Sequence, residues 1–145
     1  MTVTLVVLCA MPCPSDAAPT SNQILSYQQK MFNHSKDLAD IGKNIRGLDQ
    51  EITINLMDIV DEYHIILKHI QDIILIESLV KNPADKQRIK PIISRSISFV
   101  ADEIDLSINR INTGLSHLNN QAVISTATKI RDDLRGLQEL LRNSE

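Results

Sequence analysis

Hydrophobic residues recur every three or four positions along four consecutive segments, the spacing that places side chains on one face of an α-helix. The predicted helices cover about residues 22–47, 50–81, 83–118 and 120–143. The register is clearest in the third segment, where the apolar positions are Ile93, Ile97, Val100, Ile104, Ile108, Ile111, Leu115 and Leu118. Between residues 19 and 145 no segment has the pattern of a strand, so the sequence predicts an all-α fold.

Turn and capping residues separate these segments. Asn82 can cap a helix whose first residue is Pro83, and Asn119-Asn120 interrupts the pattern before the last segment. Pro91 lies inside the third segment, where we expect a kink or a short separate turn. Four amphipathic helices joined by short turns favour an antiparallel, up-down four-helix bundle, with residues 19–145 as a single domain.

The opening segment, MTVTLVVLCAMPCPSDAAPTSNQ, is typical of an export signal. Its apolar run from Val3 to Met11 is far shorter than the ~20 residues of a membrane-spanning helix. Ser15-Asp16-Ala17 fits the small residues that a signal peptidase needs, although no basic residue precedes the apolar run. Residues 1–18 are therefore predicted to be a cleaved signal peptide, and the mature chain periplasmic or extracellular. In the alternative, they stay attached as a membrane or lipid anchor.

Composition argues against several functional classes. The formal net charge is −3 and no long basic run occurs, so we expect no nucleic-acid partner. The chain has four glycines, too few and too scattered for a phosphate-binding loop. Both cysteines, Cys9 and Cys13, fall in the predicted signal peptide, and no serine lies in a nucleophile-elbow context. We therefore predict no enzymatic activity, no cofactor and no membrane span in the mature chain.

Charged residues are unevenly distributed along the second and third segments. An acidic stretch comes first, made of Asp49, Glu51, Asp58, Asp61 and Glu62. Basic residues then gather around the turn between the two predicted helices, at Lys81, Lys86, Arg88, Lys90 and Arg95. A basic end of this kind can meet an acidic partner. These five residues are the candidate partner-binding site.

A second candidate site is a group of ionisable residues on apolar helix faces. His34 falls within the apolar stripe of the first helix, and Glu62, His69 and Glu77 project onto or near the centre of the apolar arc of the second. Carboxylates and imidazoles in a bundle core are the ligands of di-iron and zinc bundles. However, Asp61 and His64 form the only Asp-x-x-His pair, whereas the ferritin-like pattern needs two such motifs. These four residues are therefore kept as an alternative site, with no metal assigned.

The leading functional hypothesis is an exported, non-enzymatic helical-bundle protein that binds another protein. The broad apolar arc of the second helix adds a homodimer to the hypotheses, with Leu75, Ile76 and Leu79 as its seam. One alternative is a metal- or cofactor-carrying bundle. A further alternative is a secreted signalling bundle, because the general shape resembles cytokine-like proteins, although those usually carry disulfides.

Overall fold

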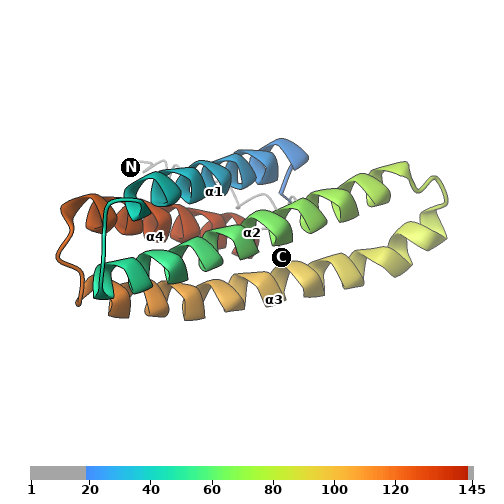
Figure 1. Ribbon diagram of the computed structural model, residues 1–145. Helices are drawn as coiled ribbons and strands as arrows, with labels where there is room; N and C mark the ends of the chain where they lie inside the picture. Colours follow the sequence, from blue (N-terminus) through green and yellow to red (C-terminus); the bar gives the residue numbers. More distant parts are fainter. Residues whose placement is uncertain (1–18, 144–145) are drawn as a thin grey trace, which may run out of the picture.

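The protein is described over residues 19–143 by a computed structural model, in which these residues form four helices and no strand (Figure 1). The helices are α1 (Ser21–Gly42), α2 (Leu48–Leu79), α3 (Pro83–Leu115) and α4 (Gln121–Arg142). The predicted all-helical bundle is confirmed for this part of the chain. The predicted signal peptide, residues 1–18, lies outside the described residues.

Side-chain caps fix the starts of three helices. At α1, the Thr20 hydroxyl accepts a hydrogen bond from the Gln23 amide and the Gln23 side chain accepts one from the Thr20 amide, which forms a capping box. Asn82 accepts from the Ala84 amide at 3.0 Å, and Pro83 occupies the first position of α3. Asn120 caps α4 in the same way. These caps explain why both predicted asparagine starts are close to the observed ones.

Two expectations about helix continuity are corrected. The first helix ends at Gly42 rather than near residue 47, and Gly47, with a φ of 67°, lies in the left-handed region before α2. The second correction concerns Pro91: the short separate turn, one of the two outcomes expected there, does not form, and α3 continues through the residue. Pro91 is exposed, so water can satisfy the carbonyl group that loses its helical donor.

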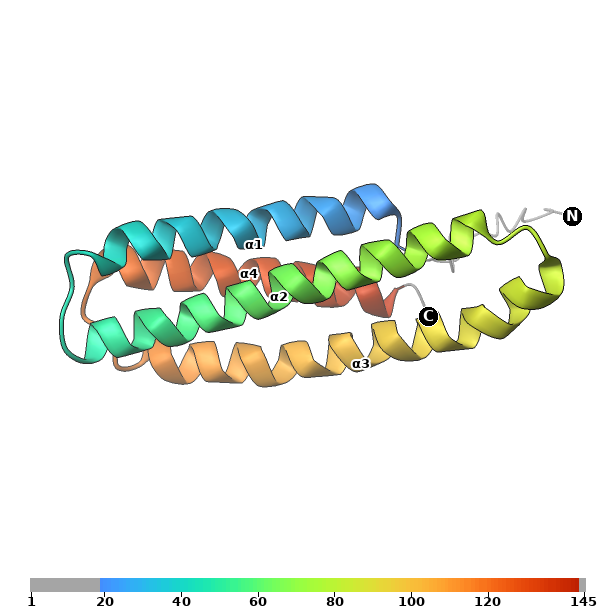
Figure 2. The same ribbon diagram turned by 45° about the vertical axis from the view of Figure 1, so that its right-hand side comes forward.

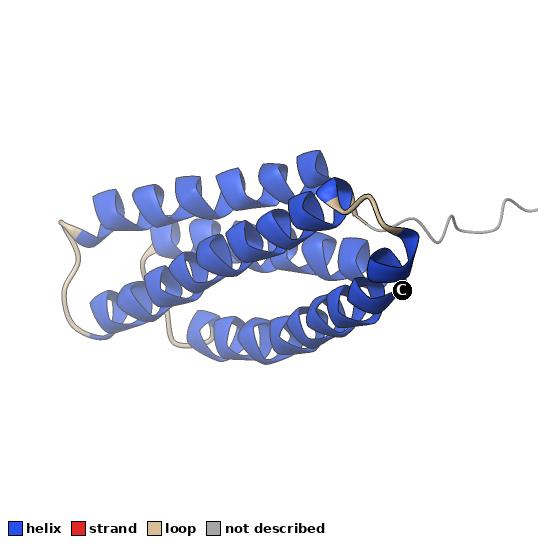
Figure 3. Ribbon diagram, turned by 90° about the vertical axis from the view of Figure 1, so that its right-hand side faces the viewer, coloured by secondary structure: helices blue, strands red, loops and turns tan. Residues whose placement is uncertain are grey.

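The helices follow one another around the bundle, and each runs antiparallel to the next (Figures 1 and 2). α1 packs most extensively on α2, α3 packs on α4, and the α1–α4 and α2–α3 contacts complete the ring. Figure 3 shows the four helices with loops as their only connections. The core lies on the inner stripes, where Tyr63, Leu67, Ile104, Ile130 and Leu134 are almost completely buried.

Unequal helix lengths give the bundle its shape. At 1.5 Å per residue, α2 and α3 are about 48–50 Å long, whereas α1 and α4 are about 33 Å long. All four helices are aligned at the end that holds the α1–α2 and α3–α4 loops, so the α2–α3 hairpin projects beyond α1 and α4 at the other end (Figure 2). The projecting part extends about 15 Å past the four-helix core.

A polar contact is buried between the two long helices. The Tyr63 hydroxyl donates to Ser107 Oγ at 3.2 Å. Burial raises the pKa of Tyr63 to about 12, although the Ser107 hydrogen bond opposes this shift. Tyr63 therefore stays neutral and acts as a packing residue with one satisfied polar atom.

Candidate protein-binding surface

The projecting end of the α2–α3 hairpin, residues 71–95, is here named the hairpin tip. None of its residues from 71 to 92 is buried, because α1 and α4 reach only its base, where the Gln71 side chain donates to Ser21 Oγ (Figure 2). The five predicted partner-binding residues lie on the hairpin tip, and all are exposed: Lys81, Lys86, Arg88, Lys90 and Arg95. None of them forms an ion pair with the described part of the chain. The structure thus gathers the five cations at one end, which also carries Asp72, Glu77 and Asp85.

Large apolar side chains are exposed on the same hairpin tip. Leu75 and Ile76 are 55% and 56% exposed, and Leu79 and Ile92 are 68% and 64% exposed. Ile65, eleven positions before Ile76, and Phe99, seven positions after Ile92, lie on the same helix faces and are 55% and 64% exposed, so these faces are open along both helices. Cations beside exposed leucine and isoleucine favour a partner surface that is both acidic and partly apolar.

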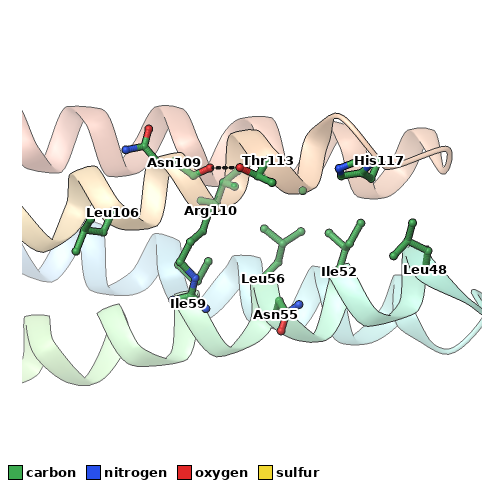
Figure 4. A pocket seen from close by; sticks show the side chains of 12 residues that line it. Leu48, Ile52, Asn55, Leu56, Ile59, Leu106, Asn109, Arg110, Thr113 and His117 are labelled. Carbon is green, nitrogen blue, oxygen red and sulfur yellow. Dashed lines mark hydrogen bonds between the residues drawn. The ribbon is translucent and has the colours of Figure 1, made fainter.

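A second surface feature runs between α2 and α3 toward the other end of the bundle. It is an open cleft of about 760 Å³ whose walls come from these two helices and from His117 in the loop after α3. Figure 4 shows Leu48, Ile52 and Ile59 on the α2 side, with Arg110 extending from α3 toward Ile59. Apolar side chains dominate the cleft, with Asn55, Asn109 and His117 among its polar members.

A smaller hollow of about 380 Å³ continues along the same two helices toward the hairpin tip. Its walls include Ile66 and His69 from α2 and Arg95 and Phe99 from α3. Phe99, one of the two phenylalanines in the chain, is 64% exposed. The cleft and the hollow together are named the outer groove, which follows the α2–α3 contact for most of its length.

The alternative site is not assembled by the fold. His34 is buried, but Glu62 and His69 are exposed on α2 and Glu77 is only partly buried. The expectation that Glu62 and His69 face the bundle core is therefore wrong. The core stripe of α2 consists of Thr53, Leu56, Ile59, Val60, Tyr63, Leu67 and Ile70, whereas Ile52, Ile66 and Ile73 lie beside it toward the outer groove. The predicted arc was widened by apolar residues that are exposed, which moved its centre toward Glu62 and His69: Ile65, Leu75, Ile76 and Leu79.

His34 instead belongs to a small polar cluster between α1 and α4. Its Nε2 lies 2.8 Å from Asp133 Oδ2, and Lys30 Nζ lies 2.6 Å from Asp133 Oδ1. Burial raises the pKa of Asp133, but the hydrogen bonds to Lys30 and His34 together lower it by a larger amount. The pKa of Asp133 therefore lies below its ordinary value. The Asp133 hydrogen bond in turn raises the pKa of Lys30. Within residues 19–143 no group of three potential ligands is arranged to hold a metal ion.

The Asp133 pairing was not found by sequence reasoning. Asp133 and His34 are 99 positions apart, and their contact depends on the register between the first and last helices. A pattern within one helix carries no signal of that register.

None of the helices within residues 19–143 has the length and apolar character that crossing a membrane requires. Comparison of the chain with family models, curated proteins and solved structures finds no match.

Proposed function

We propose that this protein is an exported, non-enzymatic binding protein whose hairpin tip contacts another protein. The observation that carries the proposal is the combination on the hairpin tip of four exposed apolar side chains and five exposed cations, which form no ion pair with residues 19–143. The partner surface that fits this combination is acidic at its edge and apolar at its centre. The export part of the proposal is supported by the opening segment, residues 1–18, through its apolar run and small residues.

The physical roles of the two kinds of side chain differ. The cations attract an acidic partner over a distance of about one Debye length, ~8–10 Å at physiological salt, and so raise the association rate. Leu75, Leu79 and their apolar neighbours supply contact area that loses water on binding and slows dissociation. A projecting hairpin presents both to a partner without steric hindrance from α1 or α4.

Charge reversal on the hairpin tip should weaken partner binding. A photo-reactive amino acid at position 79 of the full chain, expressed in the native host, should cross-link to a partner, whereas one at exposed Ile54 should not. The partner identified by the cross-link can then be purified and its binding to the chain measured. The double variant Lys86→Glu with Arg88→Glu should associate with this partner about tenfold more slowly, and the association rate should depend less on salt. The matched control is Lys36→Glu with Lys129→Glu, which makes the same change in net charge at exposed sites on α1 and α4. Equal effects of the two pairs would contradict the hairpin tip as the binding surface.

The export part of the proposal predicts a shortened mature chain. Protein recovered from the native host should begin at residue 18 or 19, because cleavage is expected after Ala17 or Ala18. Mass spectrometry of the intact protein and fractionation of the host cells measure the new terminus and the compartment. A cytoplasmic protein that still begins at Met1 would contradict export and leave the hairpin-tip experiment unaffected.

A further inference from the structure

We infer that a second copy of this chain occupies the outer groove, antiparallel to the first, with the Phe99 side chains of the two copies meeting at the two-fold axis. The inference goes beyond the proposed function, because it concerns the face lined by the outer groove. Arg95 and Ile92 belong to both surfaces, whereas the hairpin-tip proposal is tested at residues 79, 86 and 88, which do not line the outer groove. In the arrangement, α2 lies over the partner's α2 and α3 lies over the partner's α3. The axis lies in the interface and runs across the helices.

The size of the face suits a stable dimer. The α2–α3 hairpin is about 48 Å long and two helix diameters, about 20 Å, wide, which gives a footprint of about 950 Å² per copy. A standard protein interface buries about 800 Å² per partner. The walls of the outer groove are largely apolar, and Phe99 at 64% and Leu106 at 58% exposure have no cover in the single chain.

Charged residues on α3 place the axis at Phe99. Arg95 lies four residues before Phe99 and Glu103 lies four residues after it. With an axis at residue 99, each Arg95 meets the partner's Glu103, so two ion pairs flank the two phenylalanine rings. The same operation places Ile92 against the partner's Leu106, two side chains that are 64% and 58% exposed in one chain.

Two polar residues on α2 give the same axis independently. Glu62 and His69 are both exposed and have their midpoint between Ile65 and Ile66. An axis there brings each Glu62 to the partner's His69. Ile66 and Phe99 line the same hollow, so the axis derived from α2 and the axis derived from α3 coincide in space. Arg95, Glu103, Glu62 and His69 form no ion pair within the described chain, which leaves each of them available for its counterpart.

The distribution of charge also selects the direction of the second copy. A parallel copy would place the basic residues 81–95 of the two chains over one another, which is unfavourable. The antiparallel copy instead places that basic region near the partner's acidic stretch, Asp49 to Glu62. The dimer seam that the sequence suggested, Leu75, Ile76 and Leu79, does not line the outer groove and stays outside this interface.

A charge exchange tests the arrangement. The full chain should sediment as a dimer, and Arg95→Glu or Glu103→Arg alone should weaken the dimer at least tenfold, because each places like charges together at two points of the interface. The double variant, Arg95→Glu with Glu103→Arg, should restore the dimer because the exchanged charges again face opposite charges. Both residues lie outside the core, and circular dichroism checks that each variant is folded. Lys36→Glu on α1 is the control and should leave dimerisation unchanged.

A cysteine at the axis gives a second, independent readout. In a chain with Cys9→Ser and Cys13→Ser, Phe99→Cys should form a disulfide-linked dimer on mild oxidation, whereas Ile54→Cys, exposed on α2 away from the groove, should not. A wild-type chain that stays monomeric at high concentration, a double variant that fails to regain the dimer, or equal cross-linking at positions 54 and 99 would overturn the inference. So would a different protein cross-linked at position 99 of a monomeric chain. The hairpin-tip variants Lys86→Glu and Arg88→Glu test the proposed function with other residues, so the two proposals can fail separately.

Discussion

Replacing Leu67 by alanine should lower the free energy of unfolding by about 2–5 kcal/mol. Leu67 has no exposed surface and lies in the middle of the core stripe of α2, beside Tyr63 and Ile70. The substitution removes buried apolar atoms and leaves a cavity that packed helices can fill only in part. Urea unfolding followed by circular dichroism, at a low and fixed protein concentration, measures the change.

Leu75 provides the matched control for that substitution. It is the same residue type on the same helix, eight positions later, but is 55% exposed. Leu75→Ala should change the free energy of unfolding by no more than about 0.5 kcal/mol. Similar losses at positions 67 and 75 would mean that the hairpin tip is covered as fully as the core, contrary to the fold described above.

Replacing Asp133 by alanine should cost about 1–3 kcal/mol of folding free energy at neutral pH. The carboxylate accepts hydrogen bonds from Lys30 and His34. Among residues 19–143 it is the only hydrogen-bond partner of the His34 ring, since His34 Nδ1 is buried without one. The variant would therefore leave both ring nitrogens of a buried histidine without a partner inside the described chain. The neighbouring Asp132, which is 56% exposed, is the control, and Asp132→Ala should have a much smaller effect.

The same carboxylate should give the protein a sensitivity to acid. The pKa of Asp133 is lower in the folded chain than its ordinary value of 3.8, so the folded state favours the ionised form. Its contribution is complete above the unfolded pKa, near pH 4, and is lost as the pH falls through the lower folded pKa. Unfolding measured at a series of pH values below 5 should show a smaller loss in Asp133→Ala than in the wild-type chain. Parallel curves for the two proteins would contradict the Asp133 contribution.

The sequence contained enough information for the helices and their order. Capping residues such as Asn82 and Asn120 act on their own neighbours, so their effect is readable locally. The three- and four-residue spacing is likewise a property of one helix, which is why the buried faces of α3 and α4 follow the predicted stripes. The end of α1 was less readable, because Gly47 acts as the start of α2 after a loop rather than as the end of the first helix.

The candidate sites were less predictable because they depend on contacts between helices. The basic residues around Lys81 could be grouped from sequence because one turn brings them together. Whether Glu62 and His69 face the core or solvent depends on where α3 lies beside α2, and their exposure reflects that placement. The outer groove had no signal in the sequence, since Phe99 and Ile66 share a wall only through the antiparallel register of two helices.

The unequal lengths of the helices have a consequence for motion. Each long helix loses most of its neighbours beyond Ile70 on α2 and before Ile93 on α3, and with them the burial that opposes local opening. Backbone hydrogen bonds in the hairpin tip should therefore open first, and its amides should exchange with solvent well before those of the four-helix core. The hairpin tip can thus bend or repack against a binding partner, while the rest of the bundle serves as a rigid base.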